Sequence, residues 1–265
     1  METVTSSDPF SAATRTDAVP VLAAREVTVR YGAAVAVDAV TLEFPAGSVT
    51  AIVGDNGAGK STLIKVLAGA LQPTSGQVEV AGRRVEMSSP SEARRNGIET
   101  VYQDLALAEQ RSVVQNMFMG RELTRWFGPL RLLDSRRMMQ DAAAVLEELN
   151  VRIDSVNHRV QNLSGGQRQA VAIGRAVHWG SRVLIMDEPT AALGVRESAR
   201  VEELIAGLRA KGLTQIVVSH NLDHVFRLAT RIAVMRLGRL VAVRSIEETN
   251  REEIVRLVAG ITEHP

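Results

Sequence analysis

The stretch that decides the fold is a glycine-rich loop that reads Gly54-Asp55-Asn56-Gly57-Ala58-Gly59-Lys60-Ser61. It follows an apolar run at residues 48–53 and precedes a segment with helical spacing at residues 63–69. Glycines let backbone N–H groups turn inward around phosphate oxygens, and the positive end of the helix dipole adds to the attraction. A strand, such a loop and a helix in this order predict a site for the phosphates of a nucleotide.

Three side chains of this segment have expected roles. Lys60 neutralises the charge of the β- and γ-phosphates, Ser61 is an oxygen ligand for Mg²⁺, and Thr62 lies near the α-phosphate. The competing interpretation is an ordinary strand-to-helix turn with an incidental lysine. We prefer nucleotide binding because the specified glycines, Lys60 and Ser61 occur together between an apolar strand and a helix.

Composition excludes several classes of protein. The chain has 265 residues, of which 45% are hydrophobic and 23% are charged, so it can bury one large core or a core with a small satellite. Lys and Arg total 31 against 30 acidic residues, a balance that does not indicate binding to nucleic acid. The absence of cysteine excludes disulfides and thiolate metal sites. Residues 1–20 lack the features of a secretory signal, and no apolar run approaches the roughly 20 residues that span a bilayer. We expect a loose tail at residues 1–20 and a cytoplasmic protein.

From residue 21 onward, strand-like and helix-like periods alternate, which indicates an α/β fold. Val27, Val29 and Tyr31 fall on one face of a half-solvated antiparallel strand, with a partner strand at residues 37–44. A small hairpin is expected across residues 77–80 and 84–87. Further strands are predicted at residues 97–102, 183–186, 215–219, 231–235 and 239–243, and helices at residues 197–211 and 252–258.

Between residues 103 and 179 the strands are expected to stop. Helical spacing takes over there, notably at Met138, Ala142 and Leu146 behind the N-cap Asp134. We therefore predict an α/β core at residues 21–102 and 180–265, with an antiparallel β subdomain and an inserted α-helical subdomain at residues 103–179.

An acidic pair follows the apolar strand at residues 183–186. Ligands of open α/β sheets lie at the carboxyl ends of the strands, which is where Asp187 and Glu188 emerge. Asp187 is suited to hold Mg²⁺, and Glu188 is suited to orient or deprotonate an attacking water. Two solvated acids at the start of a loop are the alternative, and the glycine-rich loop upstream favours the functional interpretation.

A second glycine motif, Leu163-Ser164-Gly165-Gly166-Gln167, precedes a helix at residues 168–177. Alone it is either a structural turn or an N-cap with open backbone that can receive an anion. Between the first loop and the acidic strand end, this motif resembles the signature of the nucleotide-binding subunits of ABC transporters. The resemblance covers roughly residues 21–244 and implies a P-loop NTPase core of the ABC ATPase fold.

The resemblance implies roles for further residues. Tyr31 would stack on adenine, Gln103 would touch Mg²⁺ or the lytic water, and His220 would hydrogen-bond the γ-phosphate and hold Glu188 in line. Ser164, Gly165, Gly166 and Gln167 would close over ATP bound to a partner subunit in a head-to-tail dimer. Because the chain has one copy of each motif, two identical chains would form two complete sites.

The segment after the acidic pair points to a narrower group. The string Pro189-Thr190-Ala191-Ala192-Leu193-Gly194-Val195, with Ser219-His220-Asn221, resembles cassettes of ribose- and fructose-type importers. Gly194 stands where the family usually has an Asp that contacts the partner, which puts that coupling in doubt. The resemblance implies an ATPase, peripheral on the inner face of the cell membrane, with permease subunits and an extracytoplasmic solute-binding protein as partners.

Two other functions compete with transport. Soluble ABC ATPases that act on DNA insert a coiled coil or a zinc module, and those that act on the ribosome usually carry two cassettes. The length, the cysteine count and the near-neutral charge argue against both. A nucleotide sensor without hydrolysis is disfavoured by the intact Glu188.

Overall fold

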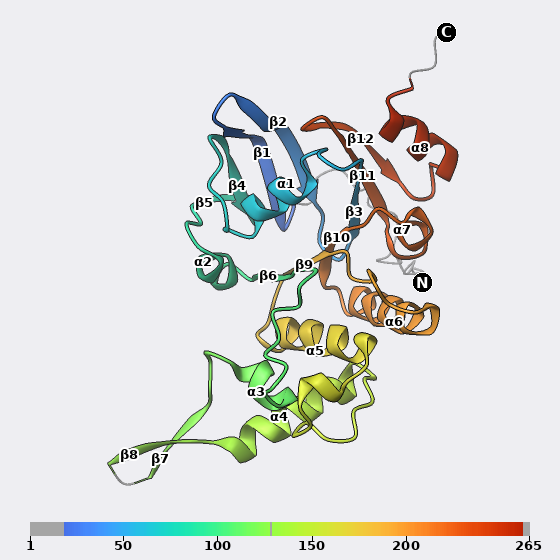
Figure 1. Cartoon of the computed structure of the whole chain (residues 1–265). Helices are drawn as coiled ribbons and strands as arrows, with labels where there is room; N and C mark the ends of the chain where they lie inside the picture. The colour runs from blue at the N-terminus through green and yellow to red at the C-terminus, as the bar shows by residue number, and fades with distance from the viewer. Residues whose placement is uncertain (1–18, 128, 262–265) are drawn as a thin grey trace, which may run out of the picture.

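The computed structural model describes residues 19–127 and 129–261, so the expected tail at residues 1–20 lies almost entirely outside the described residues. Its central sheet has six strands in the order β12-β11-β3-β10-β9-β6 (Figure 1). The bounds are β3 Val49–Val53, β6 Ile98–Val101, β9 Val183–Asp187, β10 Thr214–Val218, β11 Arg231–Arg236 and β12 Arg239–Ser245. Neighbours from β11 to β6 are parallel, and β12 joins β11 antiparallel. The sequence predicted β3, β9 and β10 because strands buried on both faces are written as nearly continuous apolar runs.

A second sheet is antiparallel and has the order β2-β1-β4-β5. Its strands are β1 Leu22–Tyr31, β2 Ala34–Phe44, β4 Ser75–Val80 and β5 Arg83–Val85. The predicted alternation along β1 was wrong at two positions, since Thr28 is buried and Tyr31 is 52% exposed. The register of β1 against β2 shifts between Val27 and Val29 and again between Val29 and Arg30, and such shifts move a side chain to the other face.

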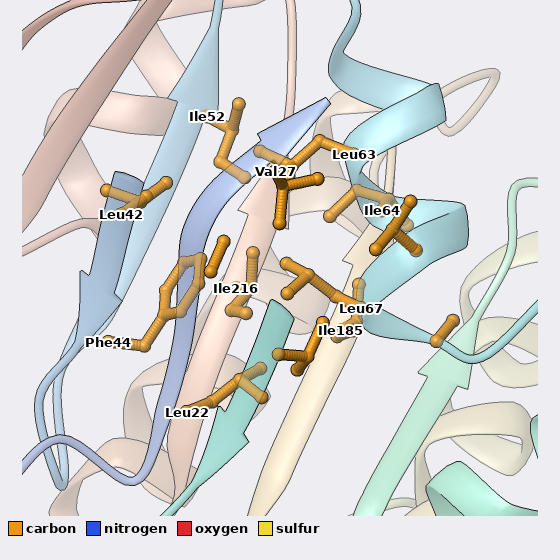
Figure 2. Close-up of a cluster of buried hydrophobic side chains, with 14 of the residues drawn as sticks. Leu22, Val27, Leu42, Phe44, Ile52, Leu63, Ile64, Leu67, Ile185 and Ile216 are labelled. Carbon is orange, nitrogen blue, oxygen red and sulfur yellow. The ribbon is translucent and has the colours of Figure 1, made fainter. Parts of the chain in front are cut away.

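Helix α1 (Lys60–Leu67) lies between the two sheets and fixes the glycine-rich loop that precedes it. Leu63, Ile64 and Leu67 are buried on this helix. Figure 2 shows them among side chains of both sheets, with Phe44 from the antiparallel sheet and Ile185 from the central sheet in the same cluster. The loop is therefore anchored at its helical end by the largest apolar cluster of the α/β part.

The inserted block at residues 103–179 has its own apolar core. The helices are α3 (Val113–Phe118), α4 (Ser135–Glu148), a 3₁₀ turn at Val160–Asn162 and α5 (Gly165–His178). As predicted, the Asp134 carboxylate accepts the N–H of Arg137 and caps α4, and Met138, Ala142 and Leu146 are buried.

The expectation that strands stop in this block was wrong. A hairpin, β7 (Thr124–Phe127) with β8 (Leu130–Leu133), projects from the block (Figure 1). Trp126 is 75% exposed and Leu130 is 60% exposed. Two short strands with arginine among apolar residues have neither a helical nor a strictly alternating period, so the pattern gave little warning.

The remaining helices cover the central sheet. Helix α6 (Val195–Ala210) packs with α5 over β9 and β10, and α7 (Leu222–Leu228) and α8 (Arg251–Ala259) share a cluster with β3 and β11. Helices α2 (Pro90–Arg95) and α7 were not predicted, because each is too short for its period to stand out; their caps, Ser89 and Asn221, were the available signal. Within the described residues, none of the helices has the length and apolarity needed to cross a bilayer.

Candidate nucleotide-binding site

Four neighbouring parallel strands carry predicted site residues at or just past their carboxyl ends. In the sheet order β3-β10-β9-β6 these are the glycine-rich loop, His220, the pair Asp187 and Glu188, and Gln103. Segments about 170 residues apart in sequence (54 to 220) thus meet at one edge of the sheet. In parallel sheets this edge is where ligands bind.

The glycine-rich loop is shaped for close backbone contact. Gly54 has φ 149° and Gly59 has φ 96°, a region that L side chains rarely adopt. A Cβ on Gly54 would lie 2.1 Å from the Met235 carbonyl oxygen, and one on Gly59 would lie 2.5 Å from the Ala36 carbonyl oxygen. Helix α1 begins after Gly59 with no side-chain cap, so the N–H groups of its first turn face the loop. A phosphate at this point would find free N–H donors and the positive end of a helix.

The Lys60 side chain bonds back to the loop that precedes it. Its Nζ donates to the carbonyl oxygens of Gly54 at 2.7 Å and Asp55 at 2.9 Å. Burial lowers the pKa of Lys60, and the carboxylates of Glu188 and Asp187 act in the opposite direction. The Lys60 ammonium therefore has only neutral carbonyl oxygens as hydrogen-bond acceptors. Phosphate oxygens, which carry negative charge, could take their place.

Asp187 ends β9 in a half-buried position. Burial raises the pKa of its carboxyl, the neighbouring Glu188 raises it further, and Lys60 opposes both. A carboxylate that is partly removed from water is stabilised in its ionised form by a nearby cation. Mg²⁺ in nucleotide sites usually takes one or two carboxylates together with substrate phosphates, so Asp187 and the Ser61 hydroxyl fit that ion.

Glu188 and His220 are in direct contact, as the family resemblance implied for the pair. The Glu188 Oε1 atom accepts from the ring Nδ1 of His220 at 2.7 Å and from its backbone N–H at 3.1 Å. Glu188 has φ 51°, unusual for a side chain of its size, and its own N–H donates to the Val218 carbonyl oxygen at 2.9 Å. The bonds from β10 and His220 hold the carboxylate at the edge where phosphates would lie.

The roles predicted for Gln103 and Tyr31 remain predictions. Gln103 is exposed two residues past β6, at the same sheet edge as Asp187. Tyr31 is exposed at the end of β1, so its ring is not part of the core and is free to stack on a base.

The Ser164 motif lies on another part of the molecule. Ser164 caps α5, its hydroxyl accepts the N–H of Gln167 at 3.3 Å, and the Gln167 side chain accepts the N–H of Ser164 at 3.0 Å. Figure 1 shows α5 and α1 well apart within the chain. The structure therefore gathers the loop, Asp187, Glu188, His220 and Gln103 at one edge and leaves the Ser164 motif away from it.

Sequence reasoning missed three residues that line the candidate site or hold its segments in place. Arg175 on α5 donates to the carbonyl oxygens of Leu105 and Ala106, both at 3.1 Å, and so holds the segment after Gln103. Val255 of α8 lines a cavity of about 560 Å³ between the glycine-rich loop and His220. Glu197 contacts the Ser164 motif, and its position three residues after Gly194 at a helix start was the available signal. No local spacing marks the other two.

Fold and site together define a nucleotide-binding cassette: a P-loop with an acidic strand end on a parallel sheet, and a second glycine motif on an inserted helical block. Residues 37–191 match the family described as ABC transporter, and the chain belongs to that family.

Similar proteins support the same assignment. The chain is 46% identical over 253 residues to the fructose import ATP-binding protein FrcA of Rhizobium meliloti, covering 93% of this chain and 96% of that protein. It is 43% identical to the xylose/arabinose import ATP-binding protein XylG of Sulfolobus acidocaldarius, over 89% of this chain and 92% of that protein. Among solved structures, the ADP conformation of MJ1267, an ATP-binding cassette of an ABC transporter, superposes with a TM-score of 0.76 at 27% identity, over 91% of this chain and 95% of that one. The fold is thus the ABC ATPase fold, and the chain binds ATP.

Proposed function

We propose that the chain is the ATP-hydrolysing subunit of an importer and that it powers the uptake of a simple sugar. One observation carries the proposal: the loop, His220, the Asp187–Glu188 pair and Gln103 follow four adjacent strands and meet at one edge of the sheet. A chain with this edge can hold a triphosphate, a metal ion and a water in a row.

ATP would be held mainly by backbone. The N–H groups of residues 54–62 and the Lys60 ammonium would surround the phosphates, and the exposed Tyr31 would stack on adenine. Ser61, Asp187 and Gln103 offer a hydroxyl, a carboxylate and an amide oxygen, a donor set that fits Mg²⁺. When bound, that ion supplies charge neutralisation at the β- and γ-phosphates.

Hydrolysis would use Glu188 as the group that orients or deprotonates water. His220 keeps the carboxylate in place through its Nδ1. Since a carboxylate only accepts hydrogen bonds, that nitrogen carries a proton. A phosphate oxygen also only accepts, so a bond from the other ring nitrogen to the γ-phosphate would require that nitrogen to be protonated as well. Gln103 would contact the same water or ion from the neighbouring strand and report the state of the site to the inserted block.

The complete site would need two chains. The Ser164 motif lies apart from the loop of its own chain, while its serine and glycines are suited to phosphate oxygens. A head-to-tail pair of identical chains would place each motif over the other chain's ATP. Binding of two ATP molecules would close the pair, and hydrolysis and product release would reopen it.

Coupling to the membrane would go through the inserted block. Arg175 joins α5 to the segment after Gln103, and this contact would carry a movement at the nucleotide to α5. We propose that this block docks on two integral membrane permease subunits. The chain would then lie in the cytoplasm, on the inner face of the cell membrane. An extracytoplasmic sugar-binding protein would complete the complex. The names of the relatives above, which import fructose, xylose or arabinose, support a monosaccharide as the solute. No role with nucleic acid is proposed.

The first test is Glu188→Gln. We expect steady-state ATP hydrolysis to fall by at least about 100-fold, the usual size of a general-base contribution. ATP binding should persist, and the variant should elute as a dimer with ATP. Glu203→Gln, an exposed charge change on α6, serves as the matched control. Unchanged hydrolysis in Glu188→Gln contradicts the catalytic assignment.

The second test addresses transport. Purification from the native membrane should recover the chain with a polytopic membrane protein, and ATP hydrolysis by that complex should rise when a monosaccharide-loaded binding protein is added. Recovery only with ribosomes or nucleic acid would support the soluble alternative instead.

A further inference from the structure

The Glu197 carboxylate lies against the start of α5, at the Ser164 motif. Its Oε1 accepts the N–H of Gly166 at 3.4 Å, and its Oε2 accepts the N–H of Gly194 at 3.4 Å. The Ser164 side chain, at the N-cap of α5, lies beside the same carboxylate. Hydrogen bonding at this position, with the Ser164 side chain as the largest contributor and the Gly166 and Gly194 N–H groups next, lowers the pKa of Glu197, so the group is an anion at neutral pH.

Close packing keeps this carboxylate in position. A Cβ on Gly166 would lie 3.1 Å from the Cβ of Glu197, and a Cβ on Gly165 would lie 2.8 Å from Cδ2 of Leu193. The two glycines thus already serve a contact within the chain, because they let the first turn of α6 approach the first turn of α5. Gly194 has no side chain to cap α6, and Glu197 takes that role from inside the helix.

The donors that bind Glu197 are the donors that the proposed dimer assigns to ATP. Ser164 has one hydroxyl hydrogen and Gly166 one N–H, so neither can serve a carboxylate and a phosphate fully at the same time. Two anions at one helix N-terminus also repel each other.

We propose that Glu197 is an internal competitor for the γ-phosphate: it holds the donors of the Ser164 motif in the separate chain and must release them when a partner's ATP arrives. This inference rests on the proposed function, since it needs the composite site between two chains. Glu197 is a positioning residue here, and its release is part of closing the dimer. The usual aspartate of the family is absent at position 194, and in this chain Glu197 links the start of α6 to the start of α5.

The experiment measures ATP-dependent dimer formation in the Glu188→Gln background by size-exclusion chromatography with light scattering. Glu197→Gln keeps the shape of the side chain and removes its charge. At a fixed ATP concentration we expect the association constant of the dimer to rise about tenfold. This is equivalent to about 1.4 kcal/mol shared by the two sites. Glu203→Gln, six residues further along the same helix and exposed, should leave the constant unchanged.

Thermal unfolding of the nucleotide-free chain separates competition from a structural role. Glu197→Gln should lower the melting temperature, because the negative charge at two helix N-termini is lost. A residue with only a structural role would lower the melting temperature and weaken the dimer together. The competitor proposed here lowers the melting temperature and strengthens the dimer.

Two results are decisive. An unchanged or weaker dimer in Glu188→Gln/Glu197→Gln, alongside a normal ATP-dependent dimer of Glu188→Gln, overturns this inference and leaves the proposed function intact. If Glu188→Gln binds ATP and stays monomeric at every protein concentration, the composite site fails, and the competitor role fails with it.

Discussion

The contact between Glu188 and His220 makes a quantitative prediction. In His220→Ala the carboxylate keeps the backbone N–H at 3.1 Å and loses the ring at 2.7 Å. A hydrogen bond to a charged group contributes about 1.5–3 kcal/mol. The His220 side chain is 74% exposed in the separate chain, so we discount the loss for solvent screening to about 1–2 kcal/mol. This corresponds to a fall in kcat of roughly 5- to 30-fold.

The double variant tests whether His220 acts through Glu188. Glu188→Gln alone should cost at least about 100-fold in kcat. If the ring works only by holding the carboxylate, adding His220→Ala to Glu188→Gln should cost little more, because residues that act as a unit are not additive.

The assay is phosphate release at saturating ATP, with ATP affinity measured separately by calorimetry. His224→Ala is a matched control, since it removes a histidine from α7 whose ring faces Glu202. Two results would refute the reasoning: full activity in His220→Ala, or a double variant slower than Glu188→Gln by the whole factor seen in the single histidine variant. The second result would mean that His220 acts on the phosphate independently of Glu188.

The remaining predictions concern the loop and the strand end. Lys60→Ala should weaken ATP binding by about 100-fold, the equivalent of one charge-assisted bond of about 2.7 kcal/mol, whereas Lys65→Ala, in the last turn of the same helix, should bind normally in the same calorimetric titration. Asp187→Asn should abolish metal-dependent hydrolysis and yet raise the melting temperature of the nucleotide-free chain at pH 7 by about 2 °C. The sign follows from the raised pKa of Asp187: folding disfavours the ionised form, so the wild-type chain is penalised above the folded pKa, and the difference between the two proteins should vanish as the pH falls below the ordinary value of 3.8. A melting temperature gap that does not shrink in acid would contradict this cause.

The sequence predicted the central sheet and the nucleotide loop well. Strands β3, β9 and β10 are buried on both faces, and a run such as Val183 to Met186 can only be written with apolar residues. The loop between Gly54 and Ser61 needs particular residues at fixed spacing, because its chemistry depends on backbone that only glycine permits. Local requirements of this kind are visible without the fold.

Strand register and short elements were harder to predict from the sequence. The predicted face of Tyr31 failed because β1 carries shifts in pairing that no local pattern announces. The hairpin of β7 and β8 was missed because its strands have four residues each and mix arginine with apolar side chains. Helix propensity and period are weak signals over so few residues.

The amino-acid sequence by itself determined the chemistry: which residues can bind phosphate, which can hold a metal ion, and which can activate water. Only the tertiary structure decided their arrangement. The order β3-β10-β9-β6 brings the segments after residues 53, 218, 187 and 101 together, and that order follows from long-range strand pairing, which leaves no trace in local sequence. The same holds for Glu197, whose carboxylate reaches the Ser164 motif because α5 and α6 pack closely at two glycines. Contacts between distant segments depend on the packing of whole elements, and therefore only the folded chain defines them.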